Sequence, residues 1–77
     1  MKWHNLDSFQ PPKPLNGPIE LVCKVRGLPF TEHLICRWDG EFWWSYLPPG
    51  LFDNFGGGWV GLPRGAEITH WAYIEPL

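Results

Sequence analysis

The side chains of this sequence that could take part in catalysis are three histidines, two cysteines and a few acids near its centre. Cys36 follows His33 by three positions, so on a strand the two side chains point to opposite faces and cannot form a nucleophile and base. Cys23 could meet His70 only if the first and last predicted strands were neighbours. His70, beside Trp71, is more typical of a structural hydrogen-bonding residue than of a base without a partner.

Metal and cofactor chemistry finds equally little support in the sequence. No CxxC motif is present, and the histidines are too far apart for the usual spacing of zinc ligands. The triple glycine at 56–58 is followed by neither the Lys-Ser/Thr pair nor the helix of a phosphate-binding loop. We therefore predict a protein that is not an enzyme and has no catalytic residue, cofactor or metal site.

Aromatic side chains are the remaining groups that could bind a partner, with six Trp, two Tyr and five Phe in 77 residues. Trp and Tyr are favoured at the centres of protein interfaces, and aromatic rings also stack on sugars and single-stranded bases. A small domain needs bulky aromatics for its core as well, so only some of them are free for binding. The predicted contact residues lie in and after the central hairpin: Trp43, Trp44, Tyr46, Phe52, Phe55 and Trp59.

Short strands separated by turn residues must position these groups. Alternating apolar residues and turn signals predict strands at 19–26, 33–38, 41–46 and 67–74. Asp39-Gly40 is a strong signal for a two-residue hairpin turn, in which Trp38 would face Glu41 and Cys36 would face Trp43. Alternation then places Trp38, Cys36, Trp43 and Leu34 on one face, and Phe42, Ile35, Trp44 and Tyr46 on the other. Both faces are apolar, so one is expected to pack on the core and the other to be covered or to bind a partner.

The predicted fold is mainly β with little helix: a small antiparallel meander or partial barrel of about three to five strands. The 77 residues suit one small domain, with a Pro-rich extended arm over 1–18 and a β-sheet core over 19–77. A net charge of −2 makes direct nucleic-acid binding unfavourable. Because no signal peptide or membrane span is recognisable, we expect a cytoplasmic protein that does not bind membranes.

Several landmarks together give a resemblance to a known family. They are Trp3, the turn Asp39-Gly40 after Trp38, and the closing run Thr69-His70-Trp71 before Pro76. In this order they resemble domain of unknown function 551, a family of small phage, prophage and bacterial proteins. The likeness covers most of the chain, although the segment 10–18 is richer in proline and 47–65 is longer than the family pattern. The resemblance implies a small β-rich fold, a mobile-element origin and structural roles for Trp3, Asp39, Gly40, Thr69, His70 and Trp71. It implies no activity.

The resulting hypothesis is a non-enzymatic protein-binding module. The resemblance suggests a phage or prophage accessory protein that docks on a host protein or protein complex and inhibits or modulates it, as an anti-CRISPR protein does. One alternative is a ligand-binding module whose aromatic platform takes carbohydrate or single-stranded nucleic acid. Another is a structural protein that self-associates, for example as a homodimer.

Overall fold

The computed structural model describes residues 1–29, 31–47, 49 and 56–75. These residues form one open antiparallel sheet of six strands and include no helix. The strands are β1 (His4–Asn5), β2 (Ile19–Arg26), β3 (His33–Trp38), β4 (Trp43–Leu47), β5 (Gly58–Gly61) and β6 (Glu67–Tyr73). The described residues therefore include no helix able to cross a membrane.

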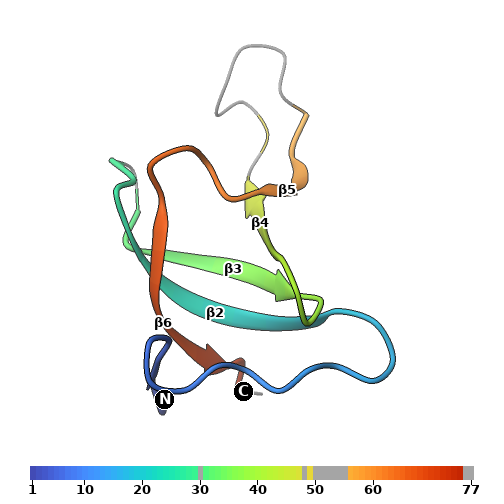
Figure 1. Cartoon of the computed structure of the whole chain (residues 1–77). Coiled ribbons are helices and arrows are strands. Elements are labelled where there is room, and N and C mark those ends of the chain that lie inside the picture. The colour runs from blue at the N-terminus through green and yellow to red at the C-terminus, as the bar shows by residue number, and fades with distance from the viewer. Residues whose placement is uncertain (30, 48, 50–55, 76–77) are drawn as a thin grey trace.

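The strand order across the sheet is β1-β6-β2-β3-β4-β5 (Figure 1). The predicted mainly β antiparallel fold is confirmed. Two short strands, β1 and β5, are present in addition to the four whose residue ranges were predicted. Strands β2 to β5 form a meander, as expected, while β6 returns to pair with β2 on its other side. The predicted bounds of β2 and β3 agree with the structure, because both strands show clean alternation between turn residues.

The hairpin between β3 and β4 has a wider turn than the sequence predicts. Trp38 pairs with Trp43 and Cys36 pairs with Ser45, whereas the two-residue turn would have paired them with Glu41 and Trp43. The register is thus displaced by two residues. Because side chains alternate with a period of two, this displacement leaves every residue on its predicted face.

The Asp39 side chain explains the wider turn. Its Oδ1 atom accepts hydrogen bonds from the backbone N–H groups of Glu41 (2.8 Å) and Phe42 (2.6 Å). Its Oδ2 atom accepts one from the indole Nε1–H of Trp44, at 3.2 Å. In a two-residue turn these amides would instead pair across the strands. A carboxylate that accepts their hydrogen bonds inside the loop therefore favours the wider turn.

Asp39 makes the hairpin sensitive to acid. The hydrogen bonds from Phe42, Glu41 and Trp44 favour the carboxylate and lower the pKa of Asp39 below its ordinary value. The folded pKa is the lower one, so this stabilisation is complete above the unfolded pKa and is lost as the pH falls through the folded pKa. We expect the Trp44 indole and Phe42 amide NMR signals to move together in acid, with a midpoint below the free Asp value of about 3.9. The same signals should not titrate in Asp39→Asn, and a wild-type midpoint above that value would contradict the assignment.

One face of the sheet, the core face, carries the hydrophobic core. The cluster takes buried residues from β2, β3, β4 and β6: Leu21, Cys23, Val25, Leu34, Cys36, Trp38, Leu47, Ile68 and Trp71. Val60 and Leu62, at the β5 end, pack against the same cluster. Strands near both edges of the sheet thus contribute residues to one core on the same face, which a flat sheet would not allow.

A β-bulge in β6 changes which residues of this strand reach the core. Lys24 pairs with His70 but the next residue, Val25, pairs with Ile68, so Thr69 is the extra residue. Simple alternation predicts Ile68 and Trp71 on opposite faces. With the bulge between them, both lie on the core face and both are buried.

The N-terminal segment is part of the globule, and the extended arm predicted over 1–18 is not confirmed. His4–Asn5 form β1, which pairs with β6 and adds an edge to the sheet. The carbonyl of Phe9 accepts a hydrogen bond from the Trp71 indole at 2.7 Å, and Pro11 is buried. Further on, Lys13 and Pro14 lie against Gly40 of the hairpin turn. In Figure 1 this segment passes along one end of the sheet, from the N-terminus towards the β3–β4 turn.

Candidate functional site

The face of the sheet opposite the core, the outer face, carries the exposed aromatic groups. We call five of its residues the aromatic patch: Ile35, Arg37, Trp44, Tyr46 and Trp59. Arg37 pairs with Trp44 across β3 and β4, and Tyr46 pairs with Trp59 across β4 and β5. Trp44 and Tyr46 are 40% and 45% exposed, although the same strands bury their alternate residues. The patch is therefore a continuous surface on three neighbouring strands.

Arg37 lies at the centre of the aromatic patch. Its guanidinium carbon is 4.2 Å from the centroid of the Trp59 ring, in a cation–π contact that reaches across β4. The same guanidinium pairs with the Glu20 carboxylate at 3.2 Å. Since this carboxylate offsets the charge of Arg37, the patch presents aromatic surface and hydrogen-bond donors rather than a strong field.

Gly61 leaves an opening at the edge of the patch. It pairs with Trp44, and a side chain added at this glycine would meet no atom within 4 Å. Trp59, two residues earlier on β5, is the neighbour of Gly61 along the same strand on this face. A glycine inside a strand often marks a place where another molecule approaches the backbone closely. The position opposite Trp44 could therefore admit a side chain from a partner.

The predicted contact residues do not all come together. Trp44, Tyr46 and Trp59 share the outer face. Trp43 lies on the core face, half-buried, with its ring centroid 4.8 Å from that of Trp38. Phe52 and Phe55 lie outside the described residues. Arg37 and Gly61 were not predicted as contact residues. Strand alternation already puts Arg37 on the face of Ile35, but Gly61 gives no signal because no strand is predicted over 58–61.

The residues that carry the family resemblance have separate positions and do not form one site. Asp39 and Gly40 shape the hairpin turn, and Gly40 has the left-handed φ of 97° that glycine favours. Thr69 is the bulge residue, His70 lies on the outer face, and Trp71 is buried in the core. Trp3 lies over the outer face near β2 and β3, with its ring 5.7 Å from that of His33.

The cysteines are buried, free thiols within the core. A hydrogen bond with Cys36 and burial both raise the pKa of the Cys23 thiol. A thiol of this kind is a poor nucleophile. The strands β2 and β6 are neighbours, which is the condition that Cys23 needs to meet His70. The two side chains nevertheless lie on opposite faces of the sheet. His33 is likewise exposed while Cys36 is buried.

Comparisons with known proteins gave no relative: no family model, no curated protein and no solved structure matches this chain. The resemblance to domain of unknown function 551 remains a prediction from the sequence.

Proposed function

We propose that the protein is a non-enzymatic binding module that docks on a partner protein through the aromatic patch. The observation that carries the proposal is a continuous exposed surface of Trp44, Tyr46 and Ile35 around the stacked pair of Arg37 and Trp59. Trp, Tyr and Arg are the residue types that most often dominate the energetics of protein interfaces. They are held here on paired strands, so that little conformational entropy is lost when a partner binds.

The local charge and ring geometry favour a protein partner over the other ligand classes. The carboxylate of Glu20 on Arg37 would repel a phosphodiester backbone. The Tyr46 and Trp59 rings meet edge to face, at an interplanar angle of 69°, and so offer no single flat platform for a sugar or a base. The narrower hypothesis, a phage-encoded inhibitor of a host protein complex, rests on the family resemblance alone.

The test is to fill the opening beside Trp44 without disturbing the sheet. Gly61→Val adds a β-branched side chain where there is open space, which suits a strand. We expect affinity for the partner, identified by co-purification from host lysate and measured by biolayer interferometry, to fall at least about tenfold. Trp44→Ala should cause a similar or larger loss, while the melting temperature of Gly61→Val stays the same or rises.

Tyr73→Ser is the matched control, because Tyr73 is 52% exposed but lies outside the patch. It should bind the partner as the wild type does. If Gly61→Val and Trp44→Ala both keep wild-type affinity, or if no partner is recovered, the proposal is wrong. Light scattering decides the self-association alternative: a dimer that dissociates in both variants would identify a second copy as the occupant of the patch.

A further inference from the structure

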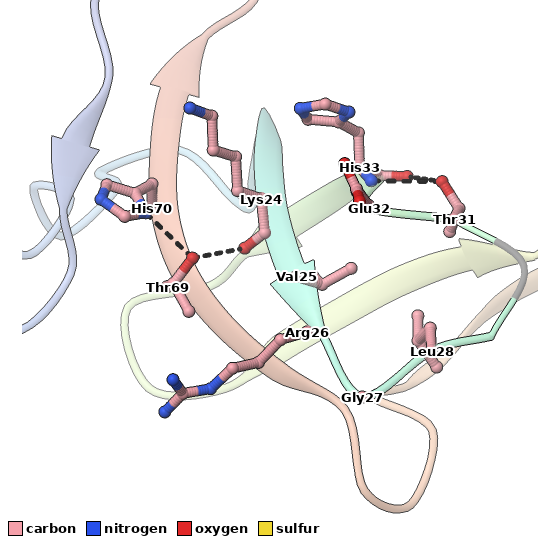
Figure 2. A pocket seen from close by; sticks show the side chains of 10 residues that line it. All are labelled: Lys24, Val25, Arg26, Gly27, Leu28, Thr31, Glu32, His33, Thr69 and His70. Atoms are coloured by element: carbon pink, nitrogen blue, oxygen red, sulfur yellow. Dashed lines mark hydrogen bonds between the residues drawn. The ribbon is translucent and has the colours of Figure 1, made fainter.

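A second feature of the outer face is a row of nitrogen-bearing side chains across three strands. Lys24 of β2 pairs directly with His33 of β3 on one side and with His70 of β6 on the other. Residues paired in this way lie on one face with their Cβ atoms about 5 Å apart. We call these three residues the donor row. Figure 2 shows the Lys24 side chain extending between the two imidazoles.

A hydrogen bond orients the His70 side chain, and a cation–π contact orients that of Lys24. The Thr69 hydroxyl donates its proton to the carbonyl of Lys24 (3.4 Å), so it accepts from Nδ1 of His70, at 2.9 Å. This network places a proton of His70 on Nδ1 and leaves Nε2 unused by these bonds, so Nε2 donates to a ligand only in the imidazolium form, in which both ring nitrogens carry a proton. The Lys24 ammonium lies 4.6 Å from the centroid of the Trp3 ring. That contact supports the ammonium from one side.

The donor row borders the hollow drawn in Figure 2, which has a volume of about 540 Å³. This volume lies within the range of small-molecule sites, about 300–1,000 Å³. Gly27, Leu28, Thr31 and Glu32 line other parts of the hollow, and Leu28, which is half-buried against the core, gives it an apolar surface. The hollow thus combines clustered donors with an apolar wall.

The charges around the hollow are only partly compensated. Arg26 is paired with Glu67, with 2.8 Å between the guanidinium nitrogen and the carboxylate oxygen. Lys24 has no ion pair among the residues that the structure describes. Glu32 is the acidic residue among those that line the hollow, and it is exposed. The ammonium of Lys24 is therefore available to a ligand, with Glu32 as the opposing charge.

We propose that this hollow binds a phosphate monoester. The phosphate lies at the donor row and the organic group lies against Leu28. A phosphate monoester carries close to two negative charges and three terminal oxygens, which suits several donors converging from neighbouring strands. A single carboxylate has fewer acceptor positions, and a polynucleotide would meet the carboxylates of Glu20 and Glu67 on the same face. The site is separate from the aromatic patch and does not rest on the proposed function.

The test is an NMR titration of the whole chain with inorganic phosphate and with phenyl phosphate, at constant ionic strength set with sodium chloride. We expect saturable shifts of the imidazole signals of His33 and His70 and of the amides of Lys24 and Thr69. The dissociation constant for inorganic phosphate should be about 1–10 mM, and phenyl phosphate should bind at least about threefold more tightly.

Four variants separate the site from general charge effects. Lys24→Gln should weaken phenyl phosphate binding at least about fivefold, whereas Lys24→Arg keeps most of it. Lys13→Gln makes the same charge change beside the Gly40 turn and should leave binding unaltered. Glu32→Gln removes the opposing carboxylate and should tighten binding.

Each of three results would overturn the proposal. They are shifts that do not saturate below about 50 mM ligand, equal loss of binding in Lys24→Gln and Lys13→Gln, and phenyl phosphate that binds no more tightly than inorganic phosphate. The amide spectrum of each variant shows whether it is folded, so a misfolded variant is replaced by the Lys24→Arg comparison.

Discussion

Replacing Trp71 by alanine is expected to lower the free energy of unfolding by about 3–5 kcal/mol, the usual cost of truncating a fully buried aromatic residue. Trp71 has no exposed surface. Its indole stacks on His4, with 4.4 Å between ring centroids, and donates to the Phe9 carbonyl. A domain of this length has a total stability of roughly 4–12 kcal/mol. The loss in Trp71→Ala is therefore a substantial fraction of the total stability, and the urea midpoint should fall well below that of the wild type.

Urea denaturation followed by far-UV circular dichroism measures this loss without relying on tryptophan fluorescence. Trp71→Phe separates the two contributions, because it keeps most of the buried ring but loses the hydrogen bond to Phe9, worth about 1 kcal/mol. Trp44→Ala is the matched control on the outer face and should cost about 1 kcal/mol or less. A loss in Trp71→Ala no greater than in Trp44→Ala would show that the N-terminal segment and core do not depend on this residue.

Gly27→Ala should produce the second largest effect, a loss of about 3 kcal/mol or more. Gly27 directly follows β2 and has a φ of 91°, in the left-handed region that costs a residue with a Cβ atom about 1–2 kcal/mol. An added Cβ would also collide with the backbone carbonyl oxygen of Gly65, in the turn before β6. Neither backbone can move without disturbing the pairing of β2 with β6.

Gly17→Ala isolates the conformational part of this cost. Gly17 has nearly the same φ, 90°, but a Cβ atom there would meet nothing within 4 Å. We expect Gly17→Ala to cost about 1 kcal/mol, measured by thermal and urea unfolding of both variants. If the two variants were equally stable, the close approach of the two loops would not contribute to folding.

The sequence predicts β2 and β3 and their faces well because these depend on local pattern, whereas the bulge at Thr69 makes simple alternation wrong for the faces of β6. The bounds of β2 and β3 follow from the alternation of Leu21, Cys23 and Val25 with polar neighbours and from the turns on either side. The faces of the hairpin were also predicted, even though its register was wrong, since a displacement by two residues preserves them. The cause of the displacement, the capture of two loop amides by Asp39, depends on a choice between two local turn structures that the sequence leaves open.

The short edge strands and the contact surface could not be predicted in the same way. β5 consists of Gly58-Trp59-Val60-Gly61, and glycines indicate a loop more strongly than a strand. β1 has two residues and forms only because β6 is beside it. Without β5, the contact of Arg37 with Trp59 and the opening at Gly61 have no counterpart in the sequence pattern. The donor row was missed for a similar reason: it needs β6 beside β2.

The bulge at Thr69 also bears on how the length of this chain can vary. Residues on its two sides follow opposite phases of the alternation, so Ile68 and Trp71 share the core while His70 remains opposite Lys24. Deleting Thr69 would restore a regular strand in which His70 and Ile68 pair with the consecutive residues Lys24 and Val25. Ile68 and Trp71 would then be two positions apart and would both still face the core. The number of residues is therefore less constrained at this position than elsewhere in β6, and an alignment of variants should tolerate a gap of one residue there.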